Sequence, residues 1–269
     1  MKQLIINPGS TSTKIAVFDD VTMIFEKTIR HTSEELQPFN RVVDQFQFRK
    51  EMIISSLKEN NISLNELDAV VGRGGLLKPI EGGTYLVNDK LIKDLETNIK
   101  GEHASNLGAL LAHSIADEVN IPSFIVDPVV VDEMEDVARI SGHPEFERIC
   151  IWHALNQKAV ARKAAIEEFG KKYDEVNFVV VHLGGGISVG AHKKGRVIDV
   201  NNALNGEGPF SPERTGSLPA AQLVKMCFSG KYTEAEIYKI IAGKGGICAY
   251  LETNSAKEVS DRANAGDDK

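Results

Sequence analysis

Two short loops of the sequence carry the residue types that bind phosphate. The first runs from Asn7 to Lys14 and reads Asn-Pro-Gly-Ser-Thr-Ser-Thr-Lys, so amide, hydroxyl and ammonium donors crowd a few positions. Phosphate oxygens are strong acceptors and favour such short-armed donors together with backbone N–H groups. The competing interpretation is a polar surface turn. The candidate phosphate-binding residues of this loop are Asn7, Ser10, Ser12 and Lys14.

The second loop is a run of three glycines, Gly184, Gly185 and Gly186, which follows His182. Residues without a Cβ let the backbone approach an anion closely and present only N–H groups to it. The triplet is a second candidate phosphate site, although a tight turn is the commoner explanation of a lone glycine triplet. Two such loops in one chain favour a polyphosphate held from opposite sides of a cleft.

Each loop is flanked by short apolar segments of the strand type, and a third such segment follows a turn. Strand, small-residue loop, strand, turn and strand thus occur in the same order twice. This order indicates a duplication, with two related domains that each open with a hairpin. The strands predicted on this pattern are residues 4–6, 15–18 and 23–28 in the first half and residues 178–181, 187–191 and 196–200 in the second.

Helices are expected between these strands. Apolar residues recur near helical spacing in residues 38–59 and 106–119, and residues 153–169 are rich in alanine and lysine. Buried strands are expected at residues 67–71 and 123–126. Strands that alternate with helices predict an α/β fold. We place the boundary between the two domains near Cys150, which gives domains 1–150 and 151–269.

Composition argues against several classes of function. The chain of 269 residues has a net charge of -7 and no face rich in lysine or arginine, so nucleic acid is not an expected partner. It contains no apolar run of about eighteen residues, so no membrane partner is expected. Cys150, Cys227 and Cys248 lie far apart without a CxxC motif, which argues against a disulfide framework or structural zinc and predicts a cytoplasmic location.

Several separate motifs resemble those of one enzyme family. Residues 6–14 resemble the first signature of the acetate and butyrate kinases, and residues 181–186 resemble their second phosphate loop. Pro8, and Gly185 where acetate kinases usually carry asparagine, favour the butyrate branch. The resemblance runs from residue 1 to the end. Two further motifs fit the same branch, GEHASN at residues 101–106 and PFSPERTG at residues 209–216.

This resemblance implies a fold. The family belongs to the superfamily of actin, Hsp70 and the sugar kinases, so two duplicated actin-like ATPase domains of the ribonuclease H type are expected around a cleft. Family members continue beyond this length with an adenosine loop, a magnesium-linked glutamate and a closing helix, so the second domain is expected to be incomplete. Gly245-Gly246 precedes a polar tail and is not taken for that adenosine loop.

The resemblance also implies residue roles in the first half of the chain. Asn7, Ser10, Ser12 and Lys14 match the family's N-terminal phosphate-site residues. His103 matches a histidine near the acyl site, and Asp127 matches an aspartate needed for catalysis that acts through Mg²⁺, directly or through its water shell. One catalytic arginine of the acetate kinases aligns with Val70, and Arg73 is the candidate to replace it.

In the second half, His153 and His182 match two active-site histidines, of which His182 contacts the transferred phosphoryl group. Arg214 matches a catalytic arginine. Without the resemblance, Arg73 and Arg214 could equally be surface ion-pair arginines, His103 and His153 helix-start residues bonded to backbone, and Asp127 a turn former before Pro128. The histidines without a surrounding motif are expected to be structural: His31, His113, His143 and His192.

The implied reaction is reversible transfer of a phosphoryl group from ATP, with Mg²⁺, to the carboxylate of butyrate or a similar short or branched fatty acid. Such an acceptor is already ionised at pH 7, because model carboxyls titrate near roughly 4. It therefore needs positive charge around it rather than a general base. A homo-oligomer, a dimer or larger, is expected from the family. Two alternatives remain: a truncated, catalytically impaired relative that binds or oligomerises, and a sugar kinase or Hsp70-like ATPase.

Overall fold

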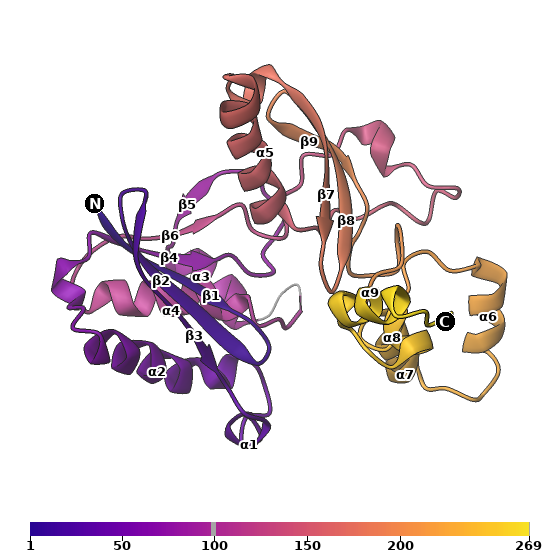
Figure 1. Cartoon of the computed structure of the whole chain (residues 1–269), viewed down its shortest axis with the longest axis horizontal. Coiled ribbons are helices and arrows are strands. Elements are labelled where there is room, and N and C mark those ends of the chain that lie inside the picture. Colours follow the sequence, from indigo (N-terminus) through magenta and orange to yellow (C-terminus); the bar gives the residue numbers. More distant parts are fainter. Residues whose placement is uncertain (98–100, 269) are drawn as a thin grey trace. The chain divides into compact units, whose positions relative to one another are not determined.

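The computed structural model describes residues 1–97 and 101–268. It divides into two compact units, Met1–Val131 (unit 1) and Asp132–Lys269 (unit 2). Each unit holds one β-sheet, and two strands of each sheet form an antiparallel hairpin around a candidate phosphate loop (Figure 1). The duplicated hairpin expected from the sequence is therefore present in both units.

Unit 1 is built on a six-stranded sheet in the order β3-β2-β1-β4-β6-β5. The hairpin β1–β2 and strand β3 are antiparallel, whereas β1, β4 and β6 run parallel to one another. The parallel strands end at one edge of the sheet, since Ile6 lies opposite Gly72 and Gly72 lies opposite Ile125. The bounds are β1 (Lys2–Pro8), β2 (Ser12–Asp19), β3 (Thr22–Arg30), β4 (Ala69–Arg73), β5 (Thr84–Leu86) and β6 (Ser123–Val126).

The core of unit 1 forms where helix α4 (Asn106–Asp117) packs against β4, β6 and β1. Leu107, Leu111 and Ile115 repeat every four residues on one face of α4 and are fully buried. Burying one such side chain stabilises the fold by roughly 1.5–3 kcal/mol. Helix α4 also contacts α2 (Phe46–Glu59) and α3 (Asp89–Glu96). The shorter helical segments of this unit are α1 (Ser33–Leu36), η1 (Val43–Gln45) and η2 (Leu64–Glu66).

Unit 2 holds a three-stranded antiparallel sheet in the order β7-β8-β9. Helix α5 (Ala154–Phe169) contacts β7 and ends at Gly170, whose φ of 59° gives the left-handed cap that glycine adopts readily (Figure 1). The buried stripe of α5 includes Lys158, whose Nζ lies 2.8 Å from both carboxylate oxygens of Glu133. The strands are β7 (Asn177–Leu183), β8 (Ile187–Lys193) and β9 (Arg196–Val200), with the 3-10 turns η3 (Asp136–Arg139) and η4 (Tyr173–Glu175).

Short helices make up the end of the described chain. Figure 1 shows α8 and α9 near the tip of the β7–β8 hairpin, and hydrogen bonds described below tie this region to the hairpin loop. None of the helices in the described ranges is both long and apolar enough to cross a membrane. The four helices are α6 (Ala220–Cys227), α7 (Glu234–Ile241), α8 (Ile247–Leu251) and α9 (Ala256–Asn264).

Most of the predicted elements are confirmed. Both hairpins, both third strands and the strand at residues 123–126 form, and the helix predicted at residues 153–169 begins at Ala154. The helix predicted from residue 38 is wrong at its start, because a 3-10 turn intervenes and α2 begins only at Phe46. Pro38 and Asn40 precede this turn, and both residue types favour turns over helix interiors.

The division between the units falls earlier in the chain than the predicted boundary near Cys150. Residues 132–150 lie in unit 2 and bond to its later residues through charged side chains. Glu133 pairs with Lys158 and accepts a hydrogen bond from the Val197 N–H at 2.8 Å, and Arg148 pairs with Asp199. Such contacts between distant positions leave no signature in a single sequence. The extents 1–150 and 151–269 stay a prediction about domain limits.

Candidate active-site residues

The candidate phosphate loop near the N-terminus is bonded from inside unit 1 by a buried arginine on α2. Arg49 is 0% exposed and donates hydrogen bonds to three loop carbonyls, those of Gly9 at 2.8 Å, Ser10 at 3.1 Å and Ser12 at 3.1 Å. Further bonds go to the Thr13 hydroxyl at 3.0 Å and to the side chain of Gln45. A single guanidinium therefore fixes the inner surface of the whole loop.

The bonds to Arg49 set the direction of the loop's N–H groups. In a trans peptide the C=O and the following N–H point in opposite directions, and no cis peptide is present in the described chain. Since the carbonyls of Gly9 and Ser10 point toward Arg49, the N–H groups of Ser10 and Thr11 point away from it. The loop thus presents N–H groups on its outer side, as an anion site requires.

Sequence reasoning missed Arg49, although a signal was present. Arg49, Ile53 and Leu57 are spaced by four residues, so they share one face of α2, and all three are at most 1% exposed. A charged residue in register with a buried apolar stripe is unusual and needs partners. Among the described residues Arg49 makes no ion pair with a carboxylate, and burial lowers the pKa of its guanidinium to about 10.

Three predicted residues lie at the edge where the parallel strands of unit 1 end. Asn7 is on β1, Arg73 is the last residue of β4, and Asp127 directly follows β6. Arg73 donates a hydrogen bond from Nη1 to Asn7 Oδ1 at 3.3 Å. Ligands of open sheets commonly bind outside the carboxyl ends of parallel strands. The structure thus brings the amide, the guanidinium and the carboxylate to one sheet edge.

Arg73 is placed where the resemblance needs a cation, whereas Val70 is not. Val70 is 0% exposed within β4 and belongs to the core. Arg73, one residue past Gly72, reaches the sheet edge, and burial lowers the pKa of its guanidinium. Among the described residues it makes no ion pair with a carboxylate, so the structural alternative of a surface ion pair does not apply to Arg73.

Asp127 is buried in a strained turn. It is 1% exposed, has a φ of 38°, and exchanges two hydrogen bonds with Gly83, whose N–H donates to Oδ1 at 2.8 Å and whose carbonyl accepts from the Asp127 N–H at 2.9 Å. A positive φ at a residue other than glycine costs roughly 1–3 kcal/mol and is common at functional sites. The turn expected from Asp-Pro is present, and Gly83 holds the buried carboxylate within it.

The remaining candidates of unit 1 have local partners. Lys14 lies opposite Asn7 in the hairpin, and its Nζ is 2.9 Å from the carboxylate of Glu26 on β3. His103 accepts a hydrogen bond at Nδ1 from the N–H of Ser105, the residue that caps α4, at 3.1 Å. This contact is the one expected of a helix-start histidine bonded to backbone, and Nδ1 is also 2.7 Å from the Ser105 hydroxyl. A role of His103 in substrate binding stays a prediction.

The donor set of unit 1 is compatible with Mg²⁺. Within residues 1–97 and 101–268, no group of three or more His, Cys, Asp and Glu side chains gathers as a metal cage. Mg²⁺ does not need one, because it keeps several waters and takes one or two carboxylates together with phosphate oxygens of the substrate. Asp127, at the same sheet edge as Asn7, fits that requirement.

In unit 2 the glycine loop lies directly against Arg214. A Cβ added at Gly186 would sit 2.0 Å from Nη1 of Arg214, so only glycine leaves room for the guanidinium. The Gly185 carbonyl accepts hydrogen bonds from the Ser211 hydroxyl at 2.6 Å and the Glu213 N–H at 3.3 Å. The following N–H, that of Gly186, therefore points the other way.

The guanidinium of Arg214 is held by a main-chain carbonyl from an earlier part of unit 2. Its Nη1 donates to the carbonyl of Ala203, and burial lowers the pKa of the guanidinium, an effect that Glu213 partly offsets. Among the described residues Arg214 makes no ion pair within salt-bridge distance, so the surface ion-pair alternative does not apply here either. A desolvated cation beside a glycine loop favours an anionic ligand.

The Gly245-Gly246 pair supports the loop that carries Arg214. A Cβ at Gly246 would lie 1.8 Å from the carbonyl oxygen of Ser211, so these backbones pack in direct contact. The Ile247 N–H donates to that same Ser211 carbonyl at 3.0 Å, and the Cys248 N–H donates to the Pro212 carbonyl at 2.9 Å. This glycine pair precedes a polar tail in the sequence and is not interpreted as the adenosine loop. In the structure it fixes the position of the loop that carries Arg214, a candidate catalytic arginine.

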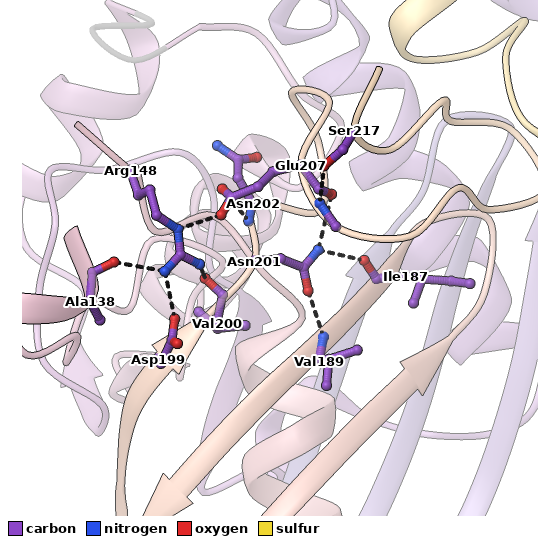
Figure 2. Close-up of polar contacts among 11 residues, drawn as sticks. Ala138, Arg148, Ile187, Val189, Asp199, Val200, Asn201, Asn202, Glu207 and Ser217 are labelled. Carbon is purple, nitrogen blue, oxygen red and sulfur yellow. Dashed lines mark hydrogen bonds and ion pairs between the residues drawn. The ribbon is translucent and has the colours of Figure 1, made fainter. Parts of the chain in front are cut away.

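A second set of contacts ties the segment before Arg214 to the sheet (Figure 2). Asn201 accepts a hydrogen bond from the Val189 N–H of β8 at 2.7 Å and donates to the carbonyl of Ile187 at 3.1 Å. Arg148 bridges the carboxylates of Asp199 at 2.9 Å and Glu207 at 2.5 Å, as Figure 2 shows. These partly buried polar contacts anchor residues 201–207 and thereby the start of the arginine loop.

The two histidines predicted from the sequence stack on each other. His153 precedes α5 and His182 is on β7, and their ring centroids are 3.8 Å apart with an angle of 8° between the planes. Nδ1 of His182 lies 2.9 Å from Asn156 Oδ1, and Nδ1 of His153 lies 2.8 Å from the Ser188 hydroxyl. A Cβ at Gly184 would be 3.0 Å from Nε2 of His182, so the glycine loop is adjacent to this pair.

Comparison with known proteins gives one family. A model described as "Acetokinase family" matches residues 148–269. A "Probable butyrate kinase" of Clostridium botulinum (strain Alaska E43 / Type E3) is 60% identical over 266 residues, which are 99% of this chain and 75% of that protein. "Butyrate kinase 1" of Clostridium acetobutylicum (strain ATCC 824) is also 60% identical, with the same coverage.

Solved structures agree on the fold. An acetate kinase of Porphyromonas gingivalis superimposes with a TM-score of 0.75 at 18% identity, covering 99% of this chain and 74% of that chain. A propionate kinase of Francisella tularensis gives a TM-score of 0.71, also at 18% identity and with the same coverage. The α/β fold class expected from the sequence, that of the actin-like ATPase domains, is confirmed.

Proposed function

Because the chain belongs to the acetokinase family, we propose that it transfers the γ-phosphate of ATP to the carboxylate of butyrate or of a similar short or branched fatty acid. The products are an acyl phosphate and ADP, and the reaction is reversible. Relatives at 60% identity that carry the name butyrate kinase support this choice of acceptor. They favour it over the impaired binding module and over a sugar kinase.

The reaction forms one bond and breaks one. A carboxylate oxygen of the fatty acid attacks the γ-phosphorus, and the bond from that phosphorus to the β,γ-bridging oxygen breaks, with its electron pair leaving on ADP. No proton has to be removed from the acceptor, since it is already ionised near pH 7. The protein's task is to bring two anions together and to stabilise the charge on the phosphoryl oxygens.

We assign phosphate binding in unit 1 to the outer side of the N-terminal loop. The N–H groups that point away from Arg49, together with the side chains of Ser10 and Ser12, supply neutral donors. The buried Arg49 adds a positive charge beneath them, and no carboxylate of the described residues pairs with it. Lys14 is proposed as a further phosphate ligand, which requires that it release Glu26.

The sheet edge of unit 1 is proposed to hold the rest of this half-site. Asn7 and Arg73 donate to phosphate or carboxylate oxygens, and their mutual hydrogen bond orients both. Asp127 is proposed to hold Mg²⁺ or its water shell. When bound to ATP, the ion neutralises charge on the phosphate oxygens. His103 and the Val129–Val131 segment after Asp127 are proposed to border the acyl chain.

In unit 2 we assign stabilisation of the transferred phosphoryl group to Arg214, His153 and His182, with the N–H groups of Gly184, Gly185 and Gly186 as phosphate donors. Arginine offers a fixed fork of donors that suits phosphoryl oxygens. The close approach of Arg214 to Gly186 is the observation that carries this assignment, because it puts a buried cation beside a backbone segment that has no Cβ to keep a phosphate away.

The experiment is trapping of the acyl phosphate. The purified chain is incubated with ATP, Mg²⁺ and butyrate, and hydroxylamine converts any product to a coloured hydroxamate. We expect Arg214→Ala to lower turnover at least about a hundredfold, the scale of losing one donor to a developing anion. Arg262→Ala, at an exposed ion pair with Asp267, is the matched control and should leave turnover unchanged. Near wild-type turnover of Arg214→Ala would contradict the assignment.

Three further properties are proposed from the thiols, the net charge and the family resemblance. The thiols of Cys150, Cys227 and Cys248 are all free, which favours a reducing cytoplasm. The net charge of -7 disfavours nucleic acid as a partner. A homo-oligomer is proposed from the family resemblance. Light scattering on the eluting protein tests it, since a monomer mass at micromolar concentration would contradict it.

A further inference from the structure

A chain of buried hydrogen bonds leads through unit 2 to His153. It links Tyr173, His192, Gln157 and Ser188 in this order. The Tyr173 hydroxyl is 2.6 Å from His192 Nδ1, and His192 Nε2 is 2.9 Å from Gln157 Oε1. Gln157 Nε2 is 2.7 Å from Ser188 Oγ, which is 2.8 Å from His153 Nδ1. Gln157 and Ser188 are 0% exposed and His192 is 2% exposed, so water does not compete for these bonds.

One contact sets the direction of all the others. Gln157 Nε2 is also 3.0 Å from the main-chain carbonyl oxygen of Ser188, which can only accept a hydrogen bond. The amide nitrogen of Gln157 therefore faces Ser188, and the amide oxygen faces His192. Because that oxygen only accepts, His192 must donate Nε2–H to it, and His192 Nδ1 then accepts from the Tyr173 hydroxyl.

A neutral His192 agrees with its surroundings. Burial, with the charge of Lys158 nearby, lowers the pKa of His192 to about 4. Glycine at position 190 makes the space for this contact. A Cβ there would lie 2.5 Å from Gln157 Oε1 and 3.1 Å from His192 Nε2. The backbone of β8 is thus adapted to the Gln157–His192 bond.

In the other direction the chain ends on His153. The Ser188 oxygen already accepts a hydrogen from Gln157, so its own O–H is directed at His153 Nδ1. Nδ1 of His153 then accepts, and the proton of the neutral ring resides on Nε2. Protonation at Nδ1 would turn the buried Ser188 O–H away from His153 and leave it without an acceptor among the contacts of the described residues.

We propose that Gln157, Ser188, His192 and Tyr173 are positioning residues that hold His153 in the Nε2–H tautomer. Its Nε2 is then a hydrogen-bond donor to the phosphoryl oxygens, which only accept. The tautomer follows from unit 2 alone, whereas its use as a donor rests on the proposed function. His192 changes in this way from a structural histidine, as the sequence suggested, to part of the active-site framework.

The tautomer is read directly by NMR of protein labelled with ¹⁵N-histidine, without substrate. Signals are assigned with His153→Gln and His192→Gln. At pH 7.5 we expect a protonated-type shift at Nε2 and an unprotonated-type shift at Nδ1 for both rings. A protonated Nδ1 on either His153 or His192 in the wild-type chain would overturn the proposal, whether or not any variant folds.

Gln157→Glu reverses the chain by an isosteric change. A carboxylate accepts at both oxygens, so the Ser188 hydroxyl turns to it and His153 must donate from Nδ1. We expect the protonated-type shift of His153 to move from Nε2 to Nδ1. The matched control, Gln222→Glu at an exposed position of α6, should leave His153 unchanged. An unchanged His153 in a folded Gln157→Glu protein whose new carboxyl is ionised, as its ¹³C chemical shift shows, would contradict the proposal.

Kinetics separate a tautomer effect from loss of structure. Outer partners that fix histidine tautomers at metal sites commonly change activity about 10–100-fold. We expect Ser188→Ala to lower kcat at least about tenfold with less than about a twofold change in the KM for ATP, and Tyr173→Phe to be milder. If His153 and His192 show the expected tautomers but the chain has no acyl kinase activity, only the proposed function is refuted. If the chain is an acyl kinase but His153 carries its proton on Nδ1, only this inference is refuted.

Discussion

The two hairpins of the molecule share a backbone plan but supply positive charge to their loops in different ways. In both, a third strand follows, and the pairing shifts register near the end of the second strand, between Val17 and Phe18 in unit 1 and between Ala191 and His192 in unit 2. In both, a loop carbonyl is tied back so that the next N–H points outward.

The source of the charge is what differs. In unit 1 a buried arginine, Arg49, lies behind the loop and bonds its carbonyls, while hydroxyl residues occupy the outer positions. In unit 2 the loop has only glycines, and Arg214 lies directly against Gly186. The hydroxyl-rich loop has room for side chains on its outer side, because Arg49 lies behind it. In the glycine loop the Arg214 guanidinium occupies the space that a Cβ of residue 186 would need. A loop's residue types therefore indicate where its charge comes from.

The sheets around the hairpins also differ. In unit 1, β1 has a partner on both sides, and Leu4 and Ile6 are fully buried. In unit 2, β7 is the edge of its described sheet, and Val179 and Leu183 are each 74% exposed. In unit 2, therefore, hydrogen bonds from loop residues, such as those of Asn201 and Arg214, position the candidate site residues. Apolar packing of the hairpin contributes less.

The largest effect that tests this comparison is expected from Gly186→Ala. The new Cβ would occupy the place of the Arg214 guanidinium, so the cation must move away from the loop. We expect turnover to fall about a hundredfold, as for loss of a transition-state donor, with the fold retained. Gly142→Ala, where a Cβ meets nothing within 4 Å, is the control. Equal turnover of the two variants in the hydroxamate assay would contradict the claim that the unit 2 loop depends on Arg214 lying against Gly186.

In unit 1 the corresponding change is Arg49→Met, which keeps the length of the side chain and removes the donors. At least three loop carbonyls lose their partner, and each buried orphan costs about 1–3 kcal/mol. We expect the midpoint of urea unfolding to fall and the Kd for ATP, measured by calorimetry on the folded protein, to rise at least about tenfold.

Arg49→Lys provides the contrast, because it keeps the charge while losing most of the bonds. If the positive charge beneath the loop contributes to ATP binding, the Kd for ATP of Arg49→Lys should lie between those of the wild type and of Arg49→Met. Unchanged ATP affinity in Arg49→Met would show that this arginine serves stability only, and the comparison of the two loops would then fail.

At the register shift, unit 2 carries a titratable residue, His192, where unit 1 carries Phe18. The pKa of His192 is about 4 in the folded chain, against the ordinary 6.5 expected on unfolding. Between these values the unfolded chain binds more protons, so the free energy of unfolding is highest above pH 6.5 and falls as the pH drops toward 4. The loss from this group amounts to at most about 3 kcal/mol.

This pH dependence is measured by urea unfolding of unit 2 between about pH 4 and pH 6.5. The fluorescence of Trp152 reports the unfolding. His192→Phe installs the residue type of unit 1 and should remove this part of the pH dependence, even though it is less stable at pH 7. An equally steep fall in stability for His192→Phe would show that other groups carry it.

The smallest effect is expected from an exposed residue of the β7–β8 hairpin, and a buried residue of the β1–β2 hairpin provides its contrast. Leu4→Ala removes a fully buried side chain of β1 and should cost about 2–5 kcal/mol in the free energy of unfolding. Leu183→Ala, at a 74% exposed position of β7, should change it by less than about 0.5 kcal/mol. Similar losses from both variants in chemical denaturation would mean that the β7 edge is covered in solution.

The sequence alone was informative where a motif and a short-range pattern coincide. The two hairpins, α4 and α5 follow from alternation and apolar spacing within a few residues, and the loops follow from their residue types. The buried strand predicted at residues 67–71 forms as β4, which extends to Arg73. How these residues act on a substrate stays a prediction.

The parts that could not be predicted depend on contacts between distant positions. Arg49 acts on a loop some forty residues earlier, Gly246 supports the backbone of Ser211, and Gln157 connects to His192 across the sheet. A single sequence records none of these pairs, since each residue has an ordinary local interpretation.

The helices α6 to α9 were not predicted. They are short, and of the four only α7 has a buried residue, Ile237, so apolar spacing shows no clear stripe. The capping box of Thr233 and Glu236 was a local signal for the start of α7.

The account rests on attack by a carboxylate oxygen on the γ-phosphorus, and an isotope measurement tests that step directly. Butyrate labelled with ¹⁸O in both carboxylate oxygens is incubated with ATP, Mg²⁺ and the chain, and hydroxylamine then releases the phosphate from the acyl phosphate. We predict released phosphate that carries one ¹⁸O atom, detected by its isotope shift in the ³¹P NMR spectrum. Phosphate without label, formed at the same rate with and without butyrate, would show hydrolysis of ATP by water and would contradict an acyl kinase.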